Sequence, residues 1–328
     1  MSKRYVFTLL LALGVLFFLT GTPEARQYYY LDLGTFTGPQ TLPGPGDSLG
    51  EALGLNDQGQ IVGWAWIWNT VGDTWEQHAV RWDLATRTFQ DLGAGNNSFA
   101  YSINNLGQIV GTAATGAVTN AFFWDPANPT LQPITNTLGG TQAWAIKIND
   151  QGQVVGYAET TMAPNPDVHA FLWPVNQKMQ DLGTMGGTQS WANDINSSGQ
   201  IVGTSITDTN GSYGAYLRDP TSGTLQPLGS FFVGGWSGGL GLNSLGQVVG
   251  WSLTTSGSFH AFLQTSLQTQ PLDLGILPGN YNYSQAMSLN AQGQIVGECG
   301  INNSGVLQPL NAFLWTGGRA CKTSMLLV

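Results

Sequence analysis

A polar turn followed by a short apolar run recurs six times along the chain. The copies read NDQGQIVG, NNLGQIVG, NDQGQVVG, NSSGQIVG, NSLGQVVG and NAQGQIVG. Their shared glutamines are separated by 48, 45, 47, 47 and 47 residues: Gln60, Gln108, Gln153, Gln200, Gln247 and Gln294. A period this regular indicates stacked copies of one supersecondary unit.

Each copy predicts four short strands. The first ends in Ile-Asn or Leu-Asn, and an Asn-x-x-Gly turn joins it to a second strand of the type Gln-Ile-Val-Gly, because Asn and Gly tolerate turn conformations. The third strand resembles His-Ala-Phe-Leu-Trp, and the fourth ends in Asp-Leu-Gly in most copies. Apolar spacing of 3.6 residues is absent from the repeats, so we expect few helices.

Four strands in a unit of about 47 residues are typical of a propeller blade, and stacked solenoid coils are the competing architecture. The order of the strands favours a ring. Tyr28–Gly34 reads as a fourth strand with no repeat before it, and the last repeat ends with its third strand at Ala312–Trp315. The sequence therefore predicts an all-β protein, a six-bladed β-propeller of four-stranded antiparallel blades. The N-terminal strand is expected to close the ring by completing the last blade.

The start of the chain predicts export. Residues 1–26 read as a secretory signal peptide, because a basic start precedes an apolar run from Tyr5 to Leu19. An uncleaved anchor is the alternative, since the run is near the lower length limit for a membrane span. The propeller is expected over residues 27–316 and a C-terminal tail over residues 317–328. We expect no membrane span in the mature chain, and a location outside the cell or at its surface.

Two cysteines and a thin, acidic charge complete the general picture. Cys299 and Cys321 are expected to form a disulfide in an oxidising location, with two free thiols as the alternative. Only 9% of the residues are charged, and the formal net charge is −9. Because a basic stripe is absent, nucleic-acid binding is not expected.

The repeated ionisable residues do not predict catalysis. The three histidines begin the third strand of copies one, three and five: His78, His169 and His260. A zinc site would need them to converge, but third strands lie away from a propeller axis, so a hydrogen bond to neighbouring backbone is the preferred interpretation. The Asp-Leu-Gly aspartates are expected to cap the following turn: Asp32, Asp91, Asp181 and Asp273. We predict no catalytic residue, no metal site and no cofactor.

Several phrases recur in the same order and carry a family resemblance. His-Ala-Phe-Leu-Trp, Asp-Leu-Gly-x-x-Gly-Gly and Ile-Asn-x-x-Gly-Gln-Ile-Val-Gly together resemble the bacterial HAF repeats of extracellular proteins, over about residues 28–316. The resemblance implies an exported, repeat-built protein and supplies no catalytic residues. The chain departs from the pattern where the histidine or the final tryptophan is replaced: Asn120, Gly214, Asn311, Arg218 and Gln264.

The segments between the second and third strands vary widely, and constant strands with variable loops are the usual division between scaffold and binding site. The first such segment holds Trp64, Trp66, Trp68 and Trp75, and two equivalent segments begin with Tyr157 and Trp251. These six residues are the predicted ligand-binding residues. The alternation in WAWIW predicts an extended hairpin with the first three tryptophans on one side. The links between blades add further aromatic residues: Trp144, Trp191, Trp236, Tyr281 and Tyr283. Filling space between the blades is the alternative role for these side chains.

Two classes of function follow from these observations. The favoured one is a secreted or surface-displayed, monomeric binding scaffold without catalysis, which recognises a glycan or an extracellular protein. The alternative is an extracellular carbohydrate-active hydrolase or lyase that uses carboxylates of the variable segments: Asp73, Glu76, Glu159, Asp167, Asp208 and Glu298. An enzyme would need a deep cleft in which two or more ionisable groups converge.

Overall fold

The protein is built from β-strands in the part of the chain that the computed structural model describes. The described residues are 50–161, 166–267, 269–303 and 306–317. No helix occurs in these ranges, which agrees with the sequence pattern, so none of their segments is a helix able to cross a membrane.

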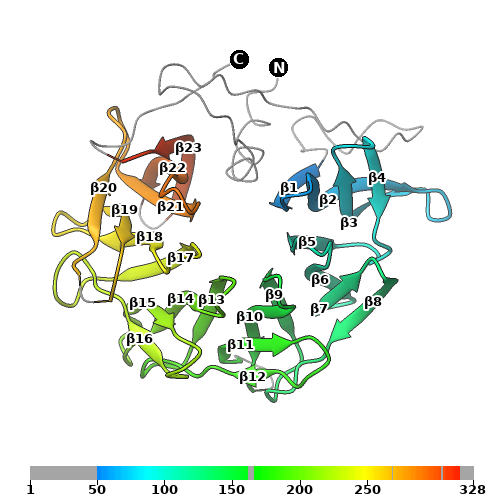
Figure 1. Cartoon of the computed structure of the whole chain (residues 1–328), viewed down its shortest axis with the longest axis horizontal. Helices are drawn as coiled ribbons and strands as arrows, with labels where there is room; N and C mark the ends of the chain where they lie inside the picture. Colours follow the sequence, from blue (N-terminus) through cyan, green and yellow to red (C-terminus); the bar gives the residue numbers. More distant parts are fainter. Residues whose placement is uncertain (1–49, 162–165, 268, 304–305, 318–328) are drawn as a thin grey trace.

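Within each sequence repeat the strands pair antiparallel in chain order, and we call each such set of strands a blade (Figure 1). The first blade contains β1 (Gly50–Leu55), β2 (Gln60–Asn69), β3 (Thr74–Asp83) and β4 (Thr88–Asp91). The second contains β5 (Ser98–Ile103), β6 (Ile109–Thr115), β7 (Val118–Asp125) and β8 (Asn128–Ile134). The third contains β9 (Ala143–Ile148), β10 (Gln153–Glu159), β11 (Val168–Pro174) and β12 (Gln180–Asp181).

The later repeats follow the same plan. The fourth blade contains β13 (Ser190–Ile195), β14 (Ile201–Ile206), β15 (Tyr213–Arg218) and β16 (Leu225–Pro227). The fifth contains β17 (Ser237–Leu242), β18 (Val248–Leu253), β19 (Phe259–Gln264) and β20 (Leu272–Gly275). The sixth repeat contributes β21 (Tyr283–Leu289), β22 (Ile295–Asn303) and β23 (Val306–Trp315). A single parallel bridge between Phe259 and Tyr283 joins the last two blades into one seven-stranded sheet.

The blades are arranged around a common axis, with the first strand of each blade nearest to it (Figure 1). This arrangement is that of a β-propeller. The hydrophobic core lies between neighbouring blades, because successive side chains of a strand point to opposite faces of its sheet. Val154 of β10 packs in the cluster shared with the second blade, whereas Val155 packs in the cluster shared with the fourth. The strands therefore read as nearly continuous apolar runs.

The asparagine that begins each turn stabilises the turn and also links it to the next blade. Its Oδ1 accepts the backbone N–H groups two and four residues later, as Asn149 does from Gln151 and Gln153. Its Nδ2 donates to the glutamine Oε1 of the same copy and to the backbone carbonyl of the next blade's asparagine. The bonds between blades measure 2.9–3.0 Å: Asn56 to Asn104, Asn104 to Asn149, Asn149 to Asn196, Asn196 to Asn243 and Asn243 to Asn290. We call this chain of bonds the asparagine ladder.

Two glycines in each copy are required by the backbone. The glycine of the Asn-x-x-Gly turn has a positive φ, for example 72° at Gly152, which other residues adopt only at a cost. The glycine after the apolar run faces a β-bulge in the first strand. At Gly156 a Cβ atom would collide with the carbonyl oxygen of Trp144. The turn chemistry that the sequence predicts is confirmed, and the second glycine has a packing reason as well.

Several sequence predictions lie outside the described residues. They are the signal segment 1–26, the closing strand Tyr28–Gly34, most of the tail 317–328 and Cys321. Among the described residues, the sixth repeat contributes three strands, whereas each of the first five repeats contributes four.

Replacing Asn149 with alanine should lower the free energy of unfolding by about 2–4 kcal/mol, because a buried side chain with four hydrogen-bonding partners is lost. Urea denaturation measures this change. The matched control is Gln151→Ala, which removes an exposed side chain from the same turn and should cost less than about 0.5 kcal/mol. Equal losses in the two variants would mean that the ladder adds no stability.

Candidate binding surface on the loop face

The two ends of the propeller axis carry different kinds of segment. The connections between second and third strands and the links between blades lie at one end, which we call the loop face. The Asn-x-x-Gly turns lie at the other end, which we call the turn face. This division follows from the antiparallel order of the strands in every blade. Most of the aromatic residues that the sequence singles out belong to the loop face.

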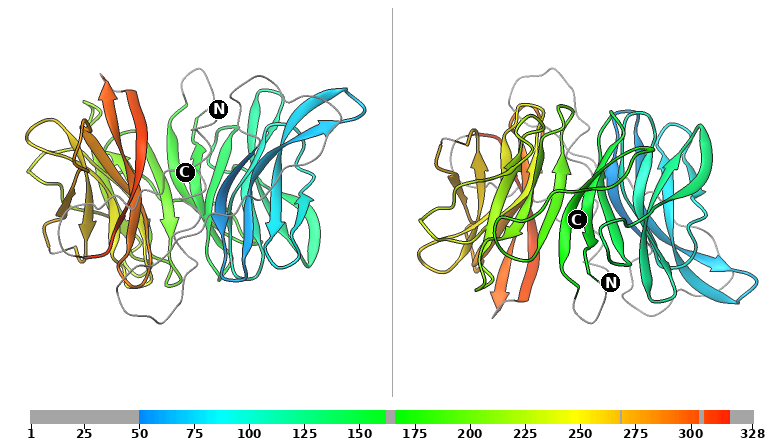
Figure 2. Two further views of the ribbon diagram at one scale, coloured as in Figure 1. Left: turned by 90° about the horizontal axis from the view of Figure 1, so that it is seen from above. Right: turned by 90° about the horizontal axis from the view of Figure 1, so that it is seen from below.

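On the loop face the first blade carries a two-stranded ribbon that projects beyond the other blades (Figure 2). Strands β2 and β3 pair from Gln60 with Asp83 up to Asn69 with Thr74. Strands β1 and β4 pair only with the part of them nearest the turn face. Near the ribbon tip the rings of Trp68 and Trp75 meet edge to face, with centroids 5.3 Å apart. The extended hairpin that the sequence predicts is therefore present.

The three tryptophans on one side of β2 differ in exposure. Trp64 is only 8% exposed, and its indole N–H donates to a Glu51 carboxylate oxygen at 2.9 Å. Its ring contacts Phe99 of the second blade. Trp66 and Trp68 are half-buried. Trp64 therefore does not belong to the exposed row that the alternation predicts, because it lies at the base of the ribbon against the next blade. Ligand binding by the remaining residues stays a prediction.

Five consecutive blades carry an aromatic side chain at one register position, where the first strand faces the second beside the bulge. The facing pairs are Glu51–Trp64, Phe99–Thr112, Trp144–Tyr157, Trp191–Thr204 and Gly238–Trp251. In the third blade both partners are aromatic, and their rings stack with centroids 4.9 Å apart. We call these aromatic residues the aromatic arc: Trp64, Phe99, Trp144, Tyr157, Trp191 and Trp251. Apart from Trp64 they are half-buried.

At the fifth blade the arc joins a cluster centred on Tyr213. The Tyr213 ring contacts Trp236, Trp191 and Trp251 at centroid distances of 5.6, 6.3 and 6.5 Å. Trp236 is 38% exposed, the one aromatic residue among the exposed large apolar side chains of the described ranges. Only Trp251 of this cluster was among the predicted ligand-binding residues. The sequence also points to Trp191 and Trp236 as aromatic residues of the links between blades, but their contacts with Tyr213 depend on the fold.

Each histidine pairs with the Asp-Leu-Gly aspartate of its own blade. The Nδ1-to-carboxylate distances are 2.8–3.0 Å: His78 to Asp91, His169 to Asp181 and His260 to Asp273. The expected bond to neighbouring backbone was therefore wrong, because the fourth strand brings a carboxylate to the third. Copies two and four lack both the histidine and the aspartate. Within the described ranges, no group of three or more His, Cys, Asp or Glu residues could hold a metal ion.

The aspartates of these pairs have a second role. Each also accepts the N–H of the glycine two residues later, at 2.7–2.8 Å. The expected capping of the turn is thereby confirmed. Burial raises the pKa of Asp91, but hydrogen bonds from His78 and from the Gly93 N–H outweigh it, so the net shift is downward. The carboxylate is held ionised by local structural contacts, which suits a stabilising role.

His78 lies between two carboxylates at the base of the ribbon. Its Nδ1 contacts Asp91, and its Nε2 lies 3.1 Å from a Glu76 oxygen. The hydrogen bond with Asp91 raises the pKa of His78, desolvation opposes this, and the bond with Glu76 adds to it. Glu76 in turn accepts the Asn69 amide at 2.8 Å, which is the main cause of its lowered pKa. The ribbon is thus anchored to the blade by an ionic network.

The carboxylates of the enzymatic alternative are engaged in their own loops. Buried Glu159 accepts the backbone N–H groups and the side chains of Thr141 and Gln142. Asp208 accepts two N–H groups of its own loop, at Asn210 and Ser212. The remaining members come from other loops: Asp73 at the ribbon tip, Glu76 beside His78, Asp167 before β11 and Glu298, which accepts the Gln285 amide at 2.7 Å. The six carboxylates belong to four different repeats: the first, third, fourth and sixth.

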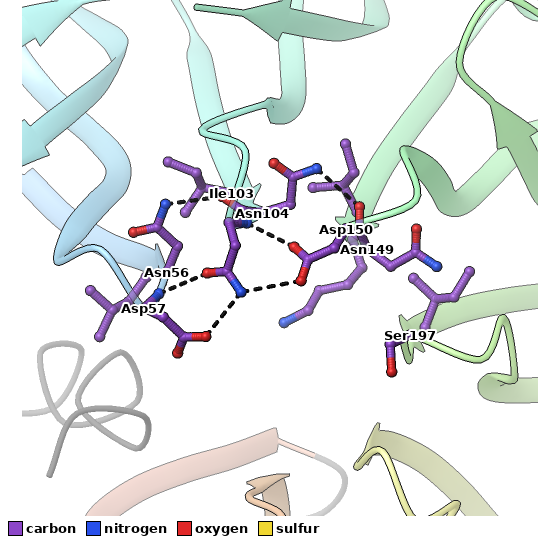
Figure 3. A pocket seen from close by; sticks show the side chains of 12 residues that line it. Asn56, Asp57, Ile103, Asn104, Asn149, Asp150 and Ser197 are labelled. Carbon is purple, nitrogen blue, oxygen red and sulfur yellow. Dashed lines mark hydrogen bonds between the residues drawn. The ribbon is translucent and has the colours of Figure 1, made fainter. Parts of the chain in front are cut away.

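The turn face has a pocket of about 220 Å³ beside the axis (Figure 3). Three of its residues follow ladder asparagines and form a hydrogen-bonded row. The Asn105 amide donates to Asp57 Oδ2 at 2.9 Å and to Asp150 Oδ2 at 3.1 Å, and the Asn105 N–H donates to Asp150 Oδ1 at 2.8 Å. Ser197 lines the same pocket. The sequence did not predict this pocket, because the residue after the ladder asparagine differs among the copies.

Comparison with known families corrects the resemblance to HAF repeats. The family model that matches, over residues 54–185, is described as a protein of unknown function (DUF3466). The match is to this family rather than to HAF repeats, so that interpretation was wrong. The recurring phrases have a structural reason in the propeller: the histidine pairs with an aspartate, and the following alanine and aromatic residue pack between blades. No curated protein matches the chain.

The solved structures similar to this one include TolB proteins and a peptidase. TolB from Acinetobacter baumannii is 15% identical, with 64% of this chain and 50% of that chain covered and a TM-score of 0.44. Putative TolB from Agrobacterium tumefaciens is 12% identical, with 71% and 81% covered and a TM-score of 0.49. Acylaminoacyl peptidase from Pyrococcus horikoshii is 12% identical, with 81% and 44% covered and a TM-score of 0.49. This chain thus spans half the length of the first, and the propeller assignment rests on the sheets described above.

The variant His78→Asn carries the residue that copies two and six have at this position. Because the folded pKa of His78 is raised, its contribution to stability is fully present below a pH of about 6.5 and is lost as the pH rises through the folded pKa. The substitution should therefore cost roughly 1 kcal/mol more at pH 5.5 than at pH 9, the scale of a partly exposed charge-assisted hydrogen bond. Urea denaturation at both pH values tests this; a pH-independent cost would contradict it.

Proposed function

We propose that this protein is a secreted or surface-displayed binding scaffold without catalysis, and that its loop face binds an uncharged polysaccharide. The observation that supports this is the aromatic arc, in which the second to fifth blades present a half-buried aromatic side chain at one register position. The half-exposed Trp66 extends the arc onto the ribbon, and Trp236 extends it onto the link between the fourth and fifth blades.

Stacking on aromatic rings suits sugars. A pyranose ring has an apolar face of C–H groups that packs on Trp or Tyr, while its hydroxyls bond to polar groups around it. An exposed apolar patch on a soluble protein is typical of an interaction site. With only 9% charged residues in the chain, recognition by charge has few groups to draw on. A neutral glycan is therefore favoured over a highly charged ligand.

The enzymatic alternative has less support. A hydrolase or lyase needs two ionisable groups that converge on one cleft. The carboxylates named for this role come from four different repeats, and those with described partners fix their own loops, as Glu159 and Asp208 do. A protein partner is the other alternative, and the binding experiments below distinguish it.

We also propose that the blades form a closed six-bladed ring, in which Tyr28–Gly34 adds a fourth strand beside β23. In support, the sixth repeat has three described strands where each of the first five has four. The Cys299 side chain is fully buried on β22, and its pairing with Cys321 belongs to the same proposal. The proposal also includes export from the cell, because the disulfide needs an oxidising location.

Deletion of residues 27–34 tests the closure. The variant should expose the edge of β23 and lower the melting temperature by at least several degrees, or cause aggregation. Differential scanning calorimetry together with light scattering measures both effects. A variant that melts and remains monodisperse like the parent would rule out the closing strand and would leave the binding proposal untouched.

Trp66→Ala tests the binding surface through the ribbon. For a polysaccharide found by screening, the substitution should weaken binding by roughly 1–3 kcal/mol, the scale of a lost aromatic contact. Binding by the parent should change little between 50 mM and 500 mM NaCl, because few ion pairs contribute. The matched control is Ile67→Ala, which changes the opposite side of the same strand. Equal affinity of Trp66→Ala and the parent would exclude the ribbon from the site.

A further inference from the structure

We infer that the Tyr213 cluster (Trp191, Tyr213, Trp236 and Trp251) is the principal sugar-binding subsite, and that a neutral polysaccharide chain follows the aromatic arc away from it. The inference rests on the proposed function and identifies where the ligand binds and what kind of ligand it is. Four observations carry it: the composition around the cluster, the way its rings are held, the exposure of Trp236 and the position of the ribbon.

The surroundings of the cluster are polar but almost uncharged. Its rings come from four segments, residues 184–191, 204–213, 230–237 and 251–259, which contain one charged residue, Asp208. The Asp208 carboxylate already accepts two backbone N–H groups of its own loop. The same segments are rich in Ser, Thr, Asn and Gln, which offer the hydroxyl and amide groups that sugar hydroxyls bond.

This composition separates a glycan from a protein partner. Interfaces between proteins are enriched in arginine as well as aromatic residues, and arginine is prominent among the residues that dominate their binding energy. The four segments contain no arginine and no lysine. Aromatic faces surrounded by hydroxyl and amide groups are instead the arrangement that a neutral sugar needs. We therefore commit to a neutral polysaccharide as the occupant.

The rings of the cluster are held in place before any ligand arrives. The Trp251 indole covers Gly238 so closely that a Cβ atom there would collide with the ring, and Phe259 meets it edge to face at a centroid distance of 5.2 Å. The carbonyl oxygen of Trp236 accepts the Leu253 N–H at 2.8 Å, which ties the link to β18. Binding surfaces that are already ordered lose less conformational entropy on binding.

Trp236 is the accessible member of this ordered set. It is 38% exposed, and its ring contacts Tyr213 edge to face, with an interplanar angle of 72°. Val233, in the same link, is fully exposed. A sugar ring that stacks on Trp236 would therefore displace water from an apolar surface without disturbing the core between the blades.

The ligand should be long. The ribbon of the first blade lies across the ring from the fourth and fifth blades, and the aromatic arc runs around the axis between them (Figure 1). Contacts along one chain make later binding events intramolecular, so affinity rises steeply once a ligand spans several subsites. A polymer should bind much more tightly than a short oligosaccharide of the same sugar.

Affinity gel electrophoresis tests the inference with four neutral polymers, xylan, galactomannan, laminarin and hydroxyethylcellulose, and two anionic ones, heparin and polygalacturonate. The parent should be retarded by at least one neutral polymer and more weakly by the hexasaccharide of that polymer. Trp236→Ala should reduce that affinity about tenfold or more, whereas Trp236→Phe should retain most of it. Leu245→Ala removes an exposed apolar side chain from the turn face and should leave affinity unchanged.

The outcomes separate this inference from the proposed function. If no neutral polymer retards the parent, the proposed function fails and the subsite fails with it. If a neutral polymer binds the parent and Trp236→Ala equally well, the subsite is overturned while the proposed function stands. Retardation by the anionic polymers alone would overturn stacking on a neutral chain. If the parent sediments as a dimer and Trp236→Ala as a monomer, a second copy covers the cluster, and the inference is wrong. Equal melting temperatures of the variants establish that their folds are intact.

Discussion

The asparagine ladder is the interaction on which the rest of the structure depends. One buried amide closes the turn between the two innermost strands and donates to the backbone of the next blade. Local geometry and the spacing of blades are therefore set by the same side chain. A buried amide is costly when its partners are missing, so the arrangement tolerates little displacement of one blade relative to another. This explains why the asparagine of the turn is the same in all six copies while the segments at the opposite end of the strands vary freely.

The division between constant and variable parts has a functional meaning. With the inner strands held by the ladder, the loop face can change in length and composition without loss of the core between blades. The ribbon of the first blade is an extreme case, since it extends two strands well beyond the sheet that supports it. Its own contacts, the Trp68–Trp75 pair and the network around His78, hold it in one shape. The propeller therefore acts as a rigid support on which aromatic side chains are placed.

The features that the sequence predicts correctly are those decided within a few residues. The Asn-x-x-Gly turns, the paired strands and the long hairpin of WAWIW follow from local chemistry and period, and all are present. The errors concern contacts between distant segments. Trp64 is buried because Phe99 of the next blade covers it, and each histidine meets an aspartate 12 or 13 residues later rather than backbone. The Tyr213 cluster combines residues from three separate segments with Trp191, so no single stretch of sequence indicates it.

The histidine–aspartate pairs have a consequence for how the copies can diverge. If only one partner is replaced, the remaining histidine or aspartate loses a hydrogen bond, so a single substitution is penalised. Replacing both residues removes this cost, because no histidine or aspartate is then left without its hydrogen-bonding partner. The second and fourth copies have lost both residues, and the first, third and fifth have kept both. In the sixth copy Asn311 replaces the histidine, while Asp32 lies in the strand proposed to complete that blade. The copies of this one chain thus contain three corners of a natural double-mutant cycle, and the missing corner is a histidine without its aspartate.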